Sequence, residues 1–135
     1  MRPKTPVLDR VHGIADYTIG TLLLVAPWLC GFSDHRLATA TTMTFGAVTI
    51  FYSLLTDYEL GAFRVIPFGV HLALDVLSAG LLIGSPFLFG FHDRTWIPHT
   101  VIGSVEAGLA VAAALFICLR MTMDHMPLRR QRVAH

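Results

Sequence analysis

The sequence predicts an all-α membrane protein with four transmembrane helices, arranged as two parallel helical-hairpin repeats. Apolar residues make up 54% of the 135 residues and charged residues only 14%, whereas a soluble domain has about 25% charged residues. Four apolar runs each approach the roughly 20 residues that a bilayer-crossing helix needs. The first and third runs also match each other in sequence. We expect one membrane domain over residues 1–135, with one repeat at 10–56 and the other at 65–120.

The apolar runs are residues 11–32, 37–55, 65–91 and 96–119. Backbone groups in lipid must be paired within their own segment, so each run is expected to be a helix. The links 33–36 and 92–95 are too short for anything except antiparallel neighbours, and each half is therefore a helical hairpin. The longer polar segment 56–64 separates the two halves.

The distribution of basic residues predicts the orientation in the membrane. The tails carry Arg2, Lys4, Arg10, Arg120, Arg129, Arg130 and Arg132, while each short loop has one arginine, Arg36 or Arg94. The positive-inside rule then places both termini in the cytoplasm and the protein in the cell membrane. The first apolar run contains His12 and Asp16 and is too long for a signal-peptide core, so we expect it to be retained.

An internal repeat relates the two halves. Residues 10–34 align without a gap on residues 69–93, at an offset of 59 positions, and ten of the 25 pairs are identical. The shared polar residues are the informative ones, because leucine recurs in any membrane helix. An offset that spans two helices makes the repeats parallel, related by a pseudo-twofold axis along the membrane normal.

One repeated element lies at the ends of the first and third helices. It consists of Pro27, Trp28, Gly31 and Phe32 in the first copy and of Pro86, Phe87, Gly90 and Phe91 in the second. Proline and glycine favour a helix end, and aromatic rings suit the membrane interface. Ala26-Pro27-Trp28 and Ser85-Pro86-Phe87, each followed by Leu-x-Gly-Phe, resemble the SPW-repeat family of small prokaryotic integral membrane proteins. The resemblance implies two helices per repeat and brings no activity or catalytic residues.

Ionisable residues within the predicted helices are the candidate functional groups. His12 and Asp16 lie four residues apart on the first helix, and His71 and Asp75 lie four apart on the third, so each pair shares a helix face. Glu106 lies deeper, on the fourth helix. Ionisable groups are costly inside a bilayer, and each is therefore a candidate site.

Three interpretations of these groups compete. In the structural one, the His–Asp pairs join the first and third helices, and Glu106 bonds to a polar face of the second helix formed by Thr42, Thr49 and Ser53. In the second, the protein is a small proton- or ion-coupled carrier that uses Asp16, Asp75 and Glu106. In the third, His12 and His71, with Asp16 and Asp75 beside them, ligate a metal or haem as a redox module.

No functional role is predicted for the remaining histidines or for the two cysteines. His35, His92, His99, His125 and His135 are predicted to be solvated, and Cys30 and Cys118 to be unpaired thiols. The sequence contains no catalytic triad, phosphate loop, CxxC pair or dinucleotide fingerprint, and the net charge of +1 gives no basic face for nucleic acid. We expect neither an enzyme nor a cofactor.

The sequence thus favours a structural or accessory protein of the cytoplasmic membrane. Its expected partner is the lipid bilayer itself. The stretches 80–84 and 110–114 carry small residues at both ends. Small residues allow helices to approach closely in a membrane, so we expect these stretches to permit self-association or contact with another membrane protein.

Overall fold

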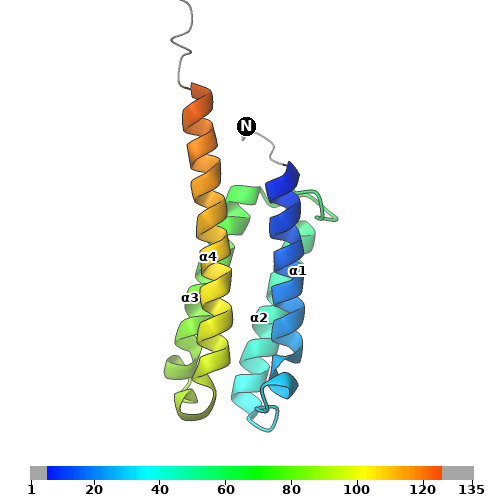
Figure 1. Cartoon of the computed structure of the whole chain (residues 1–135). Helices are drawn as coiled ribbons and strands as arrows, with labels where there is room; N and C mark the ends of the chain where they lie inside the picture. Colours follow the sequence, from blue (N-terminus) through cyan, green and yellow to red (C-terminus); the bar gives the residue numbers. More distant parts are fainter. Residues whose placement is uncertain (1–5, 126–135) are drawn as a thin grey trace, which may run out of the picture.

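The structure, a computed structural model, describes residues 6–125 as an antiparallel arrangement of helices (Figure 1). The helices are α1 (Pro6–Leu29), α2 (Arg36–Leu55), α3 (Phe68–Leu88) and α4 (His92–His125). α1 packs along α2 and α3 along α4, and contacts of α2 with α3 and of α1 with α4 close the bundle. α1 and α3 are therefore diagonal neighbours. The start of α1 and the end of α4 lie at the same end of the bundle (Figure 1), which we call the termini end.

The predicted helix starts differ from the observed ones. α1 begins at Pro6 and not at residue 11, because proline is well suited to the first helical position. α3 begins at Phe68 and not at residue 65, directly after the extended Pro67. Residues 92–95, predicted as a loop, form the first turn of α4, which is kinked at Thr95 (φ −138°, ψ 21°) and continues beyond residue 119 to His125.

Two glycines end α1 and α3 in the same way, and both helices stop three residues before the predicted ends. Gly31 has a φ of 70° and Gly90 a φ of 72°. The amide of Phe32 donates to the Pro27 carbonyl at 2.8 Å, and the amide of Phe91 donates to the Pro86 carbonyl at 2.9 Å. This bond across a left-handed residue pairs a helix-end carbonyl that would otherwise lack a donor.

Three of the helices are long and apolar enough to cross a membrane. They comprise Arg36–Leu55, Phe68–Leu88 and Thr95–Asp124. α1 is not among them, and Asp9, Arg10, His12 and Asp16 all lie in its first half. The coarse prediction of an all-helical, membrane-spanning chain is confirmed for these three helices.

The outer surface of the bundle is apolar, and much of its interior is polar. Val7, Val11, Phe51, Leu77 and Leu115 are among the large apolar side chains that are more than half exposed. The buried ionisable residues include three histidines, three aspartates and one glutamate: His12, His71, His99, Asp9, Asp16, Asp75 and Glu106. A water-soluble bundle has the opposite distribution, so lipid is the solvent that suits this surface.

The small-residue stretches are only partly available for self-association. Gly80 is exposed, and a Cβ built there would meet nothing within 4 Å. Ala110 is 1% exposed and packs inside the bundle with Phe68 and Leu72, so the prediction that it faces a second copy is wrong. Cys30 and Cys118 are both free and exposed, in agreement with the prediction of unpaired thiols.

Replacing Gly90 by Ala is expected to lower the free energy of unfolding by about 1 kcal/mol, because an L residue at positive φ brings its Cβ against a backbone carbonyl. Gly108→Ala is the matched control, since a Cβ at either position meets nothing within 4 Å beyond the local backbone and only Gly90 has a positive φ. Thermal unfolding of the full chain in detergent micelles measures both variants. Equal unfolding midpoints would contradict this requirement for glycine.

Candidate functional site

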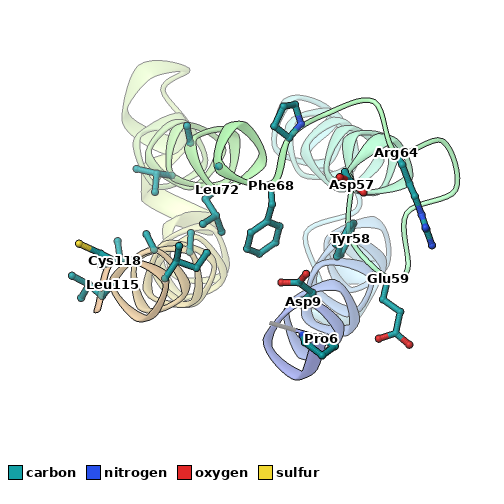
Figure 2. Close-up of a pocket in the computed structure, with 18 residues that line it drawn as sticks. Pro6, Asp9, Asp57, Tyr58, Glu59, Arg64, Phe68, Leu72, Leu115 and Cys118 are labelled. Carbon is teal, nitrogen blue, oxygen red and sulfur yellow. The ribbon is translucent and has the colours of Figure 1, made fainter. Parts of the chain in front are cut away.

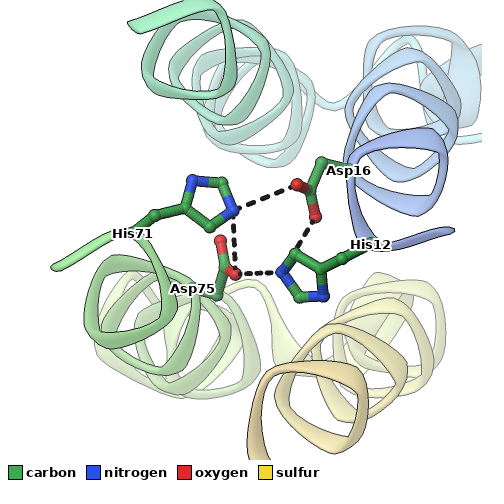
Figure 3. Close-up of side chains that lie close together, drawn as sticks. All are labelled: His12, Asp16, His71 and Asp75. Carbon is green, nitrogen blue, oxygen red and sulfur yellow. Dashed lines mark hydrogen bonds and ion pairs between the residues drawn. The ribbon is translucent and has the colours of Figure 1, made fainter. Parts of the chain in front are cut away.

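Two His–Asp pairs from opposite corners of the bundle meet at its centre (Figure 3). His12 and Asp16 come from α1, and His71 and Asp75 come from α3. One ligand atom from each of the four side chains lies within 4.8 Å of all the others. None of the four residues is more than 5% exposed. The sequence-predicted pairs are therefore brought together in one buried cluster.

The pairing in this cluster is reciprocal between the helices. His12 Nε2 lies 3.0 Å from Asp75 Oδ2, and His71 Nε2 lies 3.0 Å from Asp16 Oδ2. The contacts within each helix are longer, at 3.5 Å for His12 with Asp16 and 3.2 Å for His71 with Asp75. Each imidazole thus touches both carboxylates, and the shortest contacts join α1 to α3.

A second layer of hydroxyl groups holds the cluster in place. The Tyr52 hydroxyl donates to Asp75 Oδ1 at 2.7 Å, and the Tyr58 hydroxyl donates to Asp16 Oδ2 at 3.3 Å. Thr56 Oγ1 lies 2.8 Å from His71 Nδ1. Sequence analysis did not identify these three residues, although Tyr52 and Thr56 share a helix face at the end of α2 and Tyr58 follows in the polar link.

The hydrogen bonds of Thr56 show that Nδ1 of His71 carries a proton. The Thr56 hydroxyl also lies 2.7 Å from the Tyr52 carbonyl, which can only accept. Both hydrogen bonds are satisfied together only if Thr56 donates to that carbonyl and accepts a hydrogen bond from the Nδ1–H group of His71. Nε2 of His71 is then the nitrogen directed at Asp16 and Asp75.

Aromatic rings enclose the same cluster. Phe68 stacks on His71 with ring centroids 5.8 Å apart and meets the edge of His12 at 5.3 Å. The rings of Tyr52 and Tyr58 lie 5.1 and 5.5 Å from His71. These rings reduce the access of water, and a lower local dielectric strengthens the interactions among the four charged or polar groups.

Glu106 lies beside the cluster, but its partners differ from the prediction. Its Oε1 lies 3.4 Å from the Tyr52 hydroxyl, which makes its shorter hydrogen bond, at 2.7 Å, to Asp75. The prediction of a hydrogen bond between Glu106 and Ser53 is wrong, because Ser53 Oγ and Glu106 Oε2 are both buried without a hydrogen-bond partner. The prediction that Thr42 bonds to Glu106 is also wrong, since the Thr42 hydroxyl contacts His99 instead.

His99 was predicted to be solvated, and that prediction is wrong. Its side chain is fully buried, with Nε2 2.9 Å from Thr42 Oγ1 and Nδ1 2.7 Å from the Thr95 carbonyl. The kinked turn that precedes it directs His99 inward against the Phe32 and Phe91 rings.

The other predicted solvated histidines differ among themselves. His35 is half-buried and its Nδ1 accepts from the Ala38 amide at the start of α2. His92 is exposed, as predicted, and lies 3.1 Å from Asp93. His135 lies outside the described residues.

An apolar layer separates the His–Asp cluster from His99. It consists of Ile19, Leu23 and Leu82, with Phe45 and Ile102 packed against them. Along each helix these residues fall between the polar positions of the two regions. In the part of the chain that the structure describes, the buried polar groups therefore form two separate regions.

A cavity of about 1450 Å³ opens at the termini end, beside the cluster (Figure 2). Tyr58 and Phe68 form part of its wall, together with the apolar flanks of α3 and α4. Asp9, Asp57 and Glu59 contribute carboxylates, and Arg64 contributes the one cation among the lining residues. Burial raises the pKa of the Tyr58 hydroxyl above its usual range. The hydroxyl therefore stays protonated and donates a hydrogen bond to Asp16.

Comparison with known families identifies the architecture. A family model described as the SPW repeat domain matches residues 10–113. The chain belongs to the SPW repeat family. The match covers both His–Asp pairs, Glu106 and both Pro-aromatic elements of this SPW-repeat chain, and with the apolar helices it indicates a multi-pass membrane protein. No curated protein and no solved structure matches the chain.

His99→Ala is expected to lower the free energy of unfolding by about 2 kcal/mol, since it removes two buried hydrogen bonds and leaves a space between two phenyl rings. His92→Ala provides the control, because that histidine is exposed and its change is expected to stay within about 0.5 kcal/mol. Unfolding of both variants in detergent measures the difference. Equal destabilisation would show that the buried position of His99 contributes nothing.

Proposed function

We propose that this SPW-repeat protein is a four-span structural or accessory component of the cytoplasmic membrane, in which the His–Asp cluster holds the two hairpins together. The observation that carries the proposal is the reciprocal pairing of His12 with Asp75 and of His71 with Asp16, both at 3.0 Å. α1 and α3 are diagonal helices, so these side chains provide their connection across the bundle axis.

The distribution of side chains on α1 supports a fourth span. Its buried polar residues, Asp9, His12 and Asp16, face the bundle. From residue 11 to residue 29 its exposed side chains are all uncharged and mostly apolar, for example Val11, Ile14 and Leu22. A mean hydropathy taken over the whole helix therefore understates how well its outer face suits lipid.

The repeat hypothesis explains why the pairing is reciprocal. When a twofold axis relates two elements, a contact of residue i with residue j is matched by a contact of j with i. The 59-residue offset relates His12 to His71 and Asp16 to Asp75, and it also relates the bond at Phe32 to the one at Phe91. These equivalences support two parallel hairpins around a pseudo-twofold axis.

Charges support an orientation with both termini in the cytoplasm. Among the described residues, Arg10, Arg64 and Arg120 lie toward the termini end, while Arg36 begins α2 and Arg94 lies in the first turn of α4 at the opposite end. With the further basic residues of both tails, the termini end has the excess of positive charge that favours the cytoplasmic side.

The two other candidate functions receive less support. A carrier that used Asp16, Asp75 and Glu106 would need a polar path across the membrane, and the layer around Leu23 and Leu82 interrupts it. A haem held by His12 and His71 would need room for the macrocycle, but the two rings are 5.4 Å apart and enclosed by other aromatic side chains.

Exchanging a histidine and an aspartate tests the structural role. His12→Asp and Asp75→His are each expected to cost about 3 kcal/mol or more, because either change leaves the buried cluster with three groups of one kind. The double variant restores two imidazoles and two carboxylates and is expected to recover at least half of the summed loss. Unfolding in detergent with a chelator present measures all three variants. Strictly additive losses would refute the role of the pairing.

Single cysteines test the orientation. In a background carrying Cys30→Ser and Cys118→Ser, Ser33→Cys is expected to react with a membrane-impermeant maleimide added outside intact cells. Glu59→Cys is the matched exposed position at the other end and is expected to react only after permeabilisation. The opposite labelling pattern would reverse the proposed topology.

A further inference from the structure

We propose that His12, Asp16, His71 and Asp75 form a binding site for one divalent transition-metal cation of the zinc class, held between α1 and α3. The structural role proposed above does not require an ion, so this inference adds a ligand to the same four residues. It rests on the positions of the ligand atoms, the chemistry of the donor set, the hydroxyl groups behind it and the cavity beside it.

The His-to-Asp separations are close to those between neighbouring ligands of a tetrahedral zinc site. Zinc bonds of about 2.0–2.1 Å place neighbouring ligand atoms about 3.3 Å apart. Asp75 Oδ2 lies 3.0 Å from His12 and 3.2 Å from His71, while Asp16 meets His71 through Oδ2 at 3.0 Å and His12 through Oδ1 at 3.5 Å. One ligand atom from each of the four side chains lies within 4.8 Å of the others. A cation at their centre would therefore require only small shifts of side chains.

The donor set selects the class of cation. Imidazole nitrogens suit zinc and the neighbouring divalent transition metals, whereas magnesium and calcium prefer six or more oxygen ligands. Two carboxylates also balance the charge of one divalent cation when both imidazoles are neutral. A neutral cluster avoids the large cost of an uncompensated charge at a buried position.

Groups behind the ligands already orient them. His71 Nδ1 is held by Thr56 at 2.8 Å, which directs Nε2 to the centre. The Tyr52 hydroxyl holds Asp75 through Oδ1 and leaves Oδ2, the atom that faces both imidazoles, for a cation. Such outer hydrogen bonds typically fix the tautomer and direction of metal ligands.

The cavity at the termini end provides a route of approach. Phe68 and Tyr58 line it and also contact His71 on their inner side, so one layer of rings separates the cavity from the cluster. The charged residues that line it are Asp9, Asp57, Glu59 and Arg64, which gives an excess of carboxylates.

Cobalt and zinc titrations of the full-length protein in detergent micelles test the site. Protein treated with a chelator and then freed of it is expected to bind one equivalent of Co²⁺, with the strong visible absorption of a tetrahedral complex. Zn²⁺ is expected to displace the cobalt stoichiometrically, and a large excess of Mg²⁺ is expected to leave it bound. Absence of a saturable tetrahedral cobalt spectrum would overturn the proposal.

Variants assign the binding to the cluster. Asp75→Asn is expected to weaken cobalt binding at least a hundredfold, and Tyr52→Phe, which keeps all four ligands, by about tenfold. His92→Ala removes an exposed histidine that also lies beside an aspartate and is expected to bind like the parent. If the Asp75→Asn variant does not fold, the cobalt affinity of the Tyr52→Phe variant tests the site by itself. The proposed site would be refuted if cobalt binding were unchanged in the Tyr52→Phe and Asp75→Asn variants. It would also be refuted if His92→Ala weakened cobalt binding as much as they do.

This result is independent of the structural proposal, because the His12–Asp75 exchange is measured with a chelator present. Additive losses there with a normal cobalt titration would refute the structural role alone. A restored stability without any cobalt binding would refute the metal site alone.

Discussion

The reciprocal contact of His12 with Asp75 and of His71 with Asp16 is the interaction on which the arrangement of the bundle depends. All four side chains are buried, so their charges must be balanced within the cluster rather than by water. The two helices that carry them are diagonal neighbours, which otherwise meet through apolar side chains such as Leu23 and Leu82. The cluster therefore ties one hairpin to the other at the position where direct packing of helix against helix is weakest.

Polar groups inside and apolar groups outside follow from this constraint. Tyr52, Tyr58 and Thr56 satisfy the atoms of the cluster that do not face its centre, and Phe68 covers it. Away from the helix ends, the outer faces carry apolar residues such as Val11, Phe51 and Leu115. In lipid this distribution is favourable, because most polar atoms of the interior are paired and apolar atoms meet the hydrocarbon.

The sequence was most informative where a residue type has one dominant physical use. The helical hairpins, the His–Asp faces and the two glycine-ended helices were all predictable from spacing and composition. It was less informative for His99, which the same rules placed in solvent. The kink at Thr95 turns that side chain inward, and backbone kinks of this kind have no signature in hydropathy. Glu106 was correctly predicted to be buried, but its partner is Tyr52 and not Ser53.

By itself the sequence determined which residues repeat, which faces of the helices they occupy and how long the apolar segments are, because these properties depend only on the helical period and on side-chain chemistry. Only the tertiary structure decided that each histidine pairs most closely with the aspartate of the other helix and that Thr56 and Tyr52 stand behind them. Those contacts depend on the rotation of four helices about their axes. A rotation of one residue's turn, about 100°, would separate the pairs without changing the sequence pattern at all.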